Sequence, residues 1–202
     1  MSLCKTQTHT RVAVVGKDGQ PRMPTKASRA RRWIKEGKAI PKWNTLGMFY
    51  VKLTFDPPHS AQQSLAVGID AGTTFEGMSL VGPRYTVLNV MSEAVTWVKQ
   101  AVEHRRTMRK ARRYRQTRRR TAKDHRQTKQ KFVPPSTKAG WDSKLRIVRQ
   151  LCHILPLRYA VPEDIHASSK PNQKTWNRNF SPLEVGKQYF YAELQKLGLE
   201  VI

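Results

Sequence analysis

The stretch "LAVGIDAGTT", Leu65–Thr74, carries the clearest structural signal in the sequence. Its continuous apolar run, Leu65–Ile69, is typical of a β-strand that is buried on both faces. Asp70 ends the predicted strand, and a Gly-Thr-Thr turn follows it. An aspartate at this place can hold the magnesium of a bound nucleotide or the magnesium of a site that cuts nucleic acid. The surrounding segments separate these two hypotheses.

The segments that follow predict a mixed α/β sheet. "FEGMSLVG" and "YTVLNVM", separated by Gly82-Pro83-Arg84, are expected to extend the first strand into an antiparallel meander. Apolar residues at helical spacing begin behind Ser92, and another apolar helix face spans Trp141–Leu155. "LRYAVPED", Leu157–Asp164, predicts a strand, and the later "SPLE" and "LEVI" predict a helix and a last strand. Elements so close in sequence imply a parallel, right-handed crossover.

The N-terminal residues 1–56 predict a small basic α+β unit, with residues 57–64 as a linker. Val12–Val15 is a predicted strand, whereas the two prolines of "PRMP", Pro21–Pro24, argue against regular structure. "KASRARRWIKEGK" suits a short helix that ends at Gly37. The last strand of this unit, "FYVKLTF", alternates, and its predicted buried face consists of Phe49, Val51, Leu53 and Phe55.

The charge of the chain predicts a polyanionic partner. The sequence has 38 Lys and Arg against 14 Asp and Glu, a net charge of +24. Nucleic acid is the favoured partner, because a membrane surface would require a basic helix with a long apolar face, which the sequence lacks. There is no signal-peptide core and no apolar run of about 18 residues, so we expect a cytoplasmic protein without a membrane partner. The two cysteines, Cys4 and Cys152, are predicted to be free thiols.

An internal arginine-rich run, "EHRRTMRKARRYRQTRRRTAKDHRQTKQK", lies within residues 92–133 and predicts a basic helix with Lys and Arg on every face. Asp124 is the only acid between Arg105 and Lys131, so like charges four residues apart destabilise the isolated helix. A bound nucleic acid would neutralise them. The predicted nucleic-acid-binding residues, from this run and the N-terminal helix, are Arg105, Arg106, Arg109, Lys110, Arg112, Arg113, Arg115, Arg118, Arg119, Arg120, Lys123, Arg126, Arg29, Arg31 and Arg32.

Aromatic residues near the basic segments have two interpretations. Tyr114 could stack on a base or pack against Trp97 or the sheet. Trp33 and Trp43 are predicted to be core residues of the N-terminal unit, with stacking on nucleic acid as the alternative.

Two acids follow predicted neighbouring strands and form the candidate catalytic and metal site. Phosphoryl transfer with Mg²⁺ or Mn²⁺ needs two or three converging carboxylates. Asp70 ends the first strand, and Glu163 ends the strand that the topology places beside it, so both are expected at the carboxyl edge of parallel strands. A register shift of one residue would exchange Glu163 for Asp164. The nucleotide hypothesis is disfavoured, because the sequence has no second glycine-rich phosphate turn.

At these motifs the chain resembles the IscB/IsrB family of transposon-encoded RNA-guided nucleases. "PRMP" is similar to the family's PLMP motif, and "GIDAGTT" to its first RuvC segment. "RRTMRKARRYRQTRRR" resembles the arginine-rich bridge helix (RRXRR), and "AVPEDIHAS" the second RuvC segment, with Glu163 as metal ligand. The element order and this resemblance imply a ribonuclease H-like (RuvC) mixed sheet. Its first segment would span residues 65–91, its bridge helix 92–133 and its second segment 141–202.

The resemblance implies an RNA-guided DNA endonuclease or nickase that works as a monomer in a ribonucleoprotein. The basic helix would bind a guide RNA paired with target DNA, and Asp70 and Glu163 would bind Mg²⁺. The family's third RuvC segment has no counterpart before Ile202, so the chain is expected to be truncated, its sheet incomplete, and its cutting activity slight. A non-catalytic RNA-binding protein and an unguided RuvC-type resolvase remain as alternatives.

Overall fold

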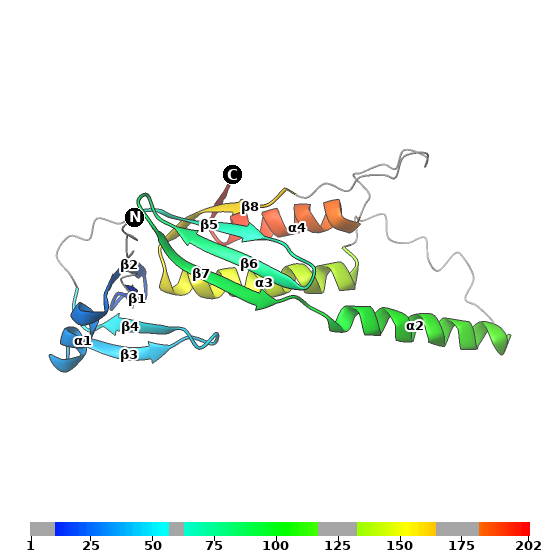
Figure 1. Cartoon of the computed structure of the whole chain (residues 1–202), viewed down its shortest axis with the longest axis horizontal. Helices are drawn as coiled ribbons and strands as arrows, with labels where there is room; N and C mark the ends of the chain where they lie inside the picture. Colours follow the sequence, from blue (N-terminus) through cyan, green and yellow to red (C-terminus); the bar gives the residue numbers. More distant parts are fainter. Residues whose placement is uncertain (1–10, 57–62, 117–132, 165–181) are drawn as a thin grey trace, which may run out of the picture.

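The computed structural model describes residues 11–56, 63–116, 133–164 and 182–202. This part of the chain is an α/β structure with two mixed β-sheets and four α-helices (Figure 1). In these residues no helix is both long enough and apolar enough to cross a membrane. The mixed α/β class predicted from the sequence is therefore confirmed.

The first sheet has the strand order β2-β1-β4-β3. Strands β1 and β4 are parallel, and the other two pairs are antiparallel. The helix α1 (Ala27–Lys35) covers one end of this sheet, where Ala30 packs with Ala39, Val51 and Leu53. Gly37, at a φ of 69°, ends the helix region as predicted. The strands are β1 (Arg11–Val15), β2 (Pro21–Lys26), β3 (Ala39–Trp43) and β4 (Phe49–Leu53).

Three predictions for the first sheet were wrong. Phe49 of β4 is 37% exposed rather than part of a buried strand face, and the other two concern the edges of the sheet. "PRMP" is not irregular but begins the edge strand β2, and β3, which contains Pro41, is the other edge strand. Proline is compatible with an edge strand, because one side of such a strand needs no N–H donors. Trp43 is 63% exposed rather than core, whereas Trp33 packs at the small cluster in an edge-to-face contact with Phe55.

The second sheet has the order β7-β6-β5-β8-β9. Strands β5, β6 and β7 form the predicted antiparallel meander, while β5, β8 and β9 are parallel. The helices α3 (Pro135–Ile154) and α4 (Pro182–Lys196) lie along one face (Figure 1). The strands are β5 (Leu65–Asp70), β6 (Phe75–Val81), β7 (Thr86–Glu93), β8 (Leu157–Pro162) and β9 (Glu200–Val201).

Strand β5 is buried on one face only, contrary to the prediction. Leu65, Val67 and Ile69 are buried against the helices, whereas Ala66 and Gly68 on the opposite face are half-buried. The prediction of burial on both faces was wrong because Ala66 and Gly68 count as apolar residues in the sequence but do not need to be buried. This open face has the small side chains that leave room for the candidate site described below.

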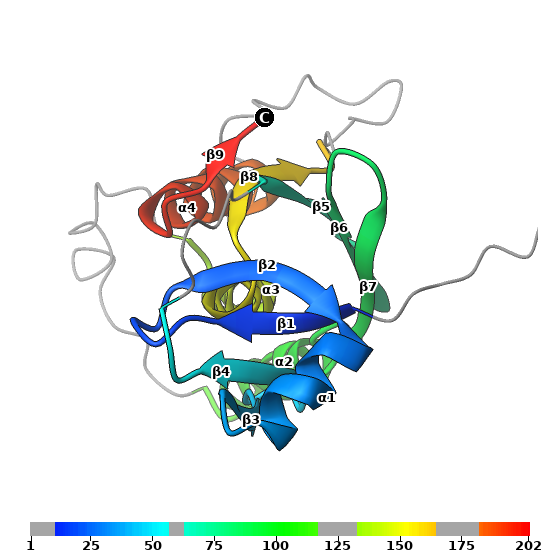
Figure 2. The ribbon, with the colours of Figure 1, turned by 90° about the vertical axis from the view of Figure 1, so that its left-hand side faces the viewer.

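The two sheets share one hydrophobic core. Ala13, Val15 and Tyr50 of the first sheet belong to the same buried cluster as Leu65 and Leu151. Helix α3 contacts both β1 and β2, and Figure 2 shows it behind these strands and below the second sheet. Arg11 also lies over the ring of Tyr85, 5.0 Å from its centroid. Residues 11–56 therefore pack as one body with the rest of the described chain.

A buried ion pair joins α3 to β6. The ammonium of Lys144 donates a hydrogen bond of 2.5 Å to Oε1 of Glu76, and these side chains are 8% and 1% exposed. The same ammonium lies over the ring of Trp141. Oε2 of Glu76 is buried and has no hydrogen-bond partner in the described structure. Removing either charge would leave the other buried and uncompensated, which is strongly destabilising.

We expect Gly186→Ala to destabilise the fold by about 1–3 kcal/mol. A Cβ at this position of α4 would lie 2.7 Å from Cγ2 of Thr137 and 2.8 Å from Cδ1 of Trp141, both on α3. Gly140→Ala is the matched control, because a Cβ there meets no atom within 4 Å and alanine favours the helix by about 0.5–1 kcal/mol. Urea unfolding measures both changes. Equal midpoints for the two variants would contradict the close helix contact.

We expect Cys152 to react slowly with iodoacetamide in the folded protein. Burial raises the pKa of its thiol from 9.0 to about 11, so at pH 9 the folded thiolate fraction is about a hundredth. The unfolded thiol ionises first, so this group's contribution to stability is present below pH 9 and is lost between pH 9 and 11. Alkylation rates of a Cys4→Ser variant, with and without urea, measure the difference. Similar rates in both conditions would contradict it.

Candidate metal site and nucleic-acid interface

Asp70 and Glu163 lie side by side at the carboxyl ends of two parallel strands. The register pairs Gly68 with Val161 and Ile69 with Pro162, so its next step sets Asp70 beside Glu163. The backbone N–H of Glu163 donates a 2.8 Å hydrogen bond to the carbonyl of Ile69. Neighbouring strands are about 4.8 Å apart, so the two residues are within reach of one small ion.

Both acidic side chains belong to the open face of the sheet. They line a shallow hollow together with Gly68, Gly77 and Ser79, all on the face opposite the helices. Asp70 lies over Gly77, because a Cβ added there would be 3.6 Å from Cβ of Asp70. On the β5 and β6 side the hollow is therefore lined by residues with little or no side chain, whereas Val161 and Pro162 of β8 line its other side.

Neither carboxylate is neutralised within the described part of the chain. Both residues are exposed, and neither side chain has an ion pair or hydrogen bond there. Their negative charges repel each other, so an added cation is favoured at this place.

Asp164 has a different environment. Its carboxylate accepts a hydrogen bond from the ammonium of Lys187 on α4, a residue that also pairs with Glu184 at 3.3 Å. Burial disfavours the charge of Lys187, but its hydrogen bonds to Asp164 and Glu184 outweigh burial and raise its pKa. Asp164 is thus tied to the helix layer, and of the two neighbouring acids it is Glu163 that shares the open face with Asp70.

The chemistry of the donor set suits a hard divalent cation. Two carboxylates supply charged oxygen ligands of the kind that Mg²⁺ and Mn²⁺ prefer. Among the described residues there is no group of three or more His, Cys, Asp or Glu that could hold a metal. Further ligands at this site would have to come from a substrate, from water or from residues outside the described ranges.

The turn after Asp70 is held by Gly72. A Cβ at Gly72 would overlap the carbonyl oxygen of Phe75, so the turn admits no larger residue without moving. The N–H of Ala94 also donates a 2.9 Å hydrogen bond to the carbonyl of Thr74. These contacts fix the segment that connects β5 to β6 and, with it, the end of β5.

The basic helix α2 (Trp97–Tyr114) is shorter than predicted at both ends. Strand β7 stays paired with β6 as far as Glu93, so the helix does not begin near Ser92. After Tyr114 the chain leaves the helix, and Gln116 has a positive φ of 50°. The predicted residues Arg118, Arg119, Arg120, Lys123 and Arg126 lie outside the described residues.

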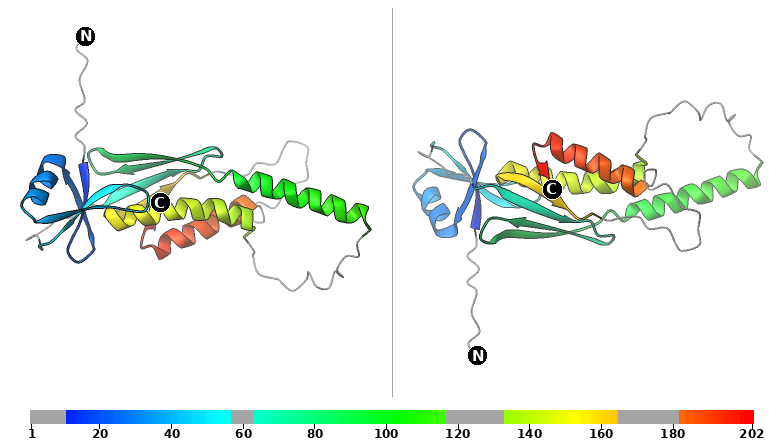
Figure 3. Two further views of the ribbon diagram at one scale, coloured as in Figure 1. Left: turned by 90° about the horizontal axis from the view of Figure 1, so that it is seen from below. Right: turned by 90° about the horizontal axis from the view of Figure 1, so that it is seen from above.

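Helix α2 projects from the body of the protein. It has no buried residue, and two further views show it running away from both sheets (Figure 3). Tyr114 is 90% exposed, so it packs neither against Trp97 nor against the sheet. A helix without a packed face receives little stabilisation from the core, which is consistent with a role in contacting a partner.

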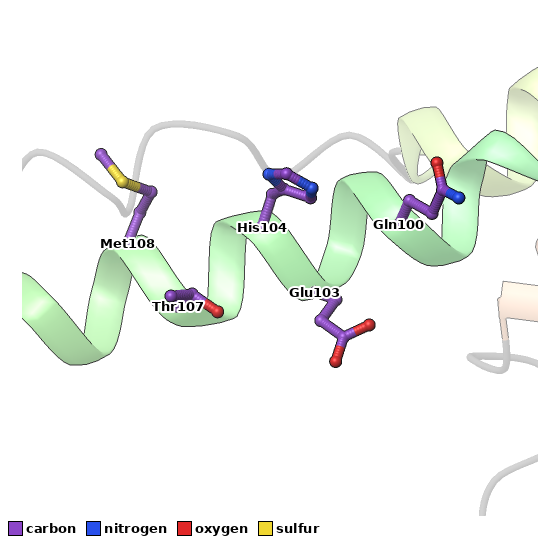
Figure 4. Close-up of a pocket in the computed structure, with 5 residues that line it drawn as sticks. All are labelled: Gln100, Glu103, His104, Thr107 and Met108. Atoms are coloured by element: carbon purple, nitrogen blue, oxygen red, sulfur yellow. The ribbon is translucent and has the colours of Figure 1, made fainter.

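The charges within α2 are segregated, whereas Lys and Arg on every face were predicted for a run that continues outside the described residues. At about 100° per residue, all Lys and Arg of the helix fall on one half of its circumference. The other half is uncharged apart from Glu103, and Gln100, His104 and Met108 follow one another along it (Figure 4). The basic half consists of Lys99, Arg105, Arg106, Arg109, Lys110, Arg112 and Arg113.

The predicted arginines of the N-terminal unit are also accessible. Arg29, Arg31 and Arg32 are exposed on α1, whose opposite side carries the buried Ala30. Sequence reasoning did not find that the charges of α2 lie on one side of the helix, because it averaged the charge over a run longer than the helix.

The sequence model of the RRXRR protein family matches residues 12–179 of the chain. The protein therefore belongs to the RRXRR family, whose domain is found in IscB/IsrB-type nucleases. A search of curated proteins finds no match to the chain.

Proposed function

We propose that the protein acts in RNA-guided, Mg²⁺-dependent cleavage or nicking of DNA, in the manner of IscB/IsrB-type nucleases. The observation that carries the proposal is the pairing of Asp70 with Glu163 on the open face of the second sheet. Membership of the RRXRR family supports it independently. So does the sheet order β7-β6-β5-β8-β9, in which an antiparallel meander continues into parallel strands, as in ribonuclease H-like folds.

In this proposal the two carboxylates hold a divalent cation at the end of β5. A bound cation would polarise a phosphate and stabilise the attacking or leaving oxygen. Asp70 and Glu163 orient the ion, and the small residues Gly68 and Gly77 leave space for a nucleic-acid backbone above the sheet. Two-metal cleavage needs more ligands than two acids, so we expect slight cutting from the described residues alone.

The basic half of α2 is proposed to bind guide RNA, alone or paired with target DNA. The helix has 18 residues and is about 27 Å long, which is enough to span several phosphates. Its segregated charge favours a partner along one side. Arginine predominates over lysine there, which suits bidentate contacts with phosphate oxygens.

A non-catalytic RNA-binding protein is the second candidate. It is favoured by the absence of a third metal-ligating acid near Asp70 in the part of the chain that the structure describes. The two candidates differ in whether the carboxylates bind a metal, and not in the role of α2.

We expect the protein without RNA to bind Mn²⁺, and Asp70→Asn or Glu163→Gln to weaken this binding about tenfold or more. Losing one of two charged ligands removes at least about 1.4 kcal/mol of binding free energy. Electron paramagnetic resonance of free Mn²⁺ measures the affinity. Glu200→Gln, an exposed acid on β9, is the matched control. If Asp70→Asn bound Mn²⁺ as tightly as the wild type, the proposed metal site would be excluded. The non-catalytic RNA-binding protein would then be the favoured candidate.

We expect the double variant Arg106→Gln/Arg113→Gln to weaken binding of an RNA hairpin. Both residues lie near the middle of the basic half, so the slope of log affinity against log salt should fall by about 1–2. Fluorescence anisotropy across a salt series measures this slope. Gln100→Ala/Thr107→Ala changes the uncharged half at the same helical spacing and should leave the slope unchanged. Equal effects of the two pairs would show that α2 does not bind RNA through one side.

A further inference from the structure

An exposed pair of aromatic rings lies at the end of the first sheet. Trp43 of β3 and Phe49 of β4 are directly paired across the two strands. Their ring centroids are 5.2 Å apart at an interplanar angle of 63°, and the residues are 63% and 37% exposed. Neither residue belongs to the hydrophobic clusters of the described structure. The packing of the protein therefore does not explain two large rings at this position.

The position of α1 accounts for their exposure. Along β3 and β4, Ala39, Val51 and Leu53 are buried beneath this helix, whereas Trp43 and Phe49 lie on the same face at the far end of the strands. Helix α1 has nine residues and is only about 14 Å long. In Figure 1, β3 runs away from α1 toward its hairpin with β4. The sheet thus extends beyond its covering helix.

The hairpin that carries the rings is well braced. The side-chain oxygen of Asn44 accepts hydrogen bonds from the N–H groups of Leu46 and Met48, at 3.0 and 2.9 Å. Gly47 has the positive φ of 73° that the turn requires. Leu46 and Met48 also pack against the large core cluster. The two rings are therefore held in place before a partner binds, which lowers the entropic cost of binding.

The charge of the protein favours a polyanionic partner. Residues 37–55 contain no acid, and the chain has a net charge of +24. The lysines of the two strands, Lys42 and Lys52, alternate onto the face opposite the rings. Addition of a β-strand at the edge of β3 is disfavoured, because Pro41 lacks an N–H there. Exposed aromatic rings in a basic setting are typical of surfaces that bind single-stranded nucleic acid.

We propose that Trp43 and Phe49 form a stacking platform for unpaired nucleotides. Every base has a flat π face that can stack on an aromatic ring, and the net charge of +24 attracts the phosphates. Bases inside a duplex already stack on each other, so the platform discriminates in favour of single strands. This contact is additional to that of α2 and requires neither the metal site nor nuclease activity.

The test measures binding of the full chain to a 12-nucleotide oligouridylate and to an RNA duplex of equal length by fluorescence anisotropy. Trp43→Leu should weaken binding of the single strand roughly 5- to 100-fold and change duplex binding little. Trp43→Phe keeps a ring and should retain most of the affinity, and Phe49→Leu should weaken it. Met91→Ala, which removes a large apolar side chain that is 75% exposed on β7, is the matched control.

Tryptophan fluorescence gives a second readout. The oligouridylate should quench wild-type emission, and Trp43→Phe should lose most of that quenching. Oligothymidylate in the same assay distinguishes an RNA strand from a DNA strand, and tight binding of either supports the platform. Equal affinity of wild type and Trp43→Leu, or equal losses for Trp43→Leu and Trp43→Phe, would overturn it. A negative result in the Mn²⁺ or α2 experiment would argue against the proposed function and would not change the outcome expected here. The stacking platform and the proposed function are therefore tested independently.

Discussion

The parallel pairing of β5 with β8 is the constraint on which the candidate site depends. The two strands are far apart in sequence. The hydrogen bond from the N–H of Glu163 to the carbonyl of Ile69 sets their register at the carboxyl ends, where the two acids lie. A slip of one residue would move Glu163 to the helix side and bring Asp164 to the open face. The pairing of Asp164 with Lys187 on α4 opposes such a slip. The acids at the sheet edge are thus positioned by the packing behind them.

The distribution of charge divides the surface of the described protein into basic and acidic regions. The positive charge is concentrated on exposed surfaces, above all on one half of α2 and on α1. The acids Glu76, Asp164 and Glu184 are paired with the buried amines Lys144 and Lys187, whereas Asp70 and Glu163 have no basic partner in the described structure. A polyanion drawn to the basic surfaces would approach the second sheet with its own negative charge, and a cation at the two acids would reduce the repulsion.

The sequence predicted the second sheet well, because its strands are apolar runs separated by clear turns and its connections obey simple rules. The meander, the parallel placement of β8 and the adjacency of Asp70 and Glu163 followed from those features. Prediction from the sequence failed for residues whose conformation or burial depends on neighbouring elements of the fold. Prolines such as Pro41 are permitted in β3 because that strand is at an edge, and Trp43 is exposed because α1 is too short to cover it. Neither fact can be read from local composition. The roles of Asp70 and Glu163 remain predictions.

The buried pair of Lys144 and Glu76 has a consequence for the placement of α3 on the second sheet. If α3 moved by one turn along the sheet, Lys144 and Glu76 would separate and both charges would be buried without a partner. The ion pair therefore favours a single position of α3 along its axis. Pro135, where α3 begins, is thereby fixed relative to the meander. A load applied at the start of α3 would pass through this pair to β6, the strand that is hydrogen-bonded to β5 and lies beside Asp70.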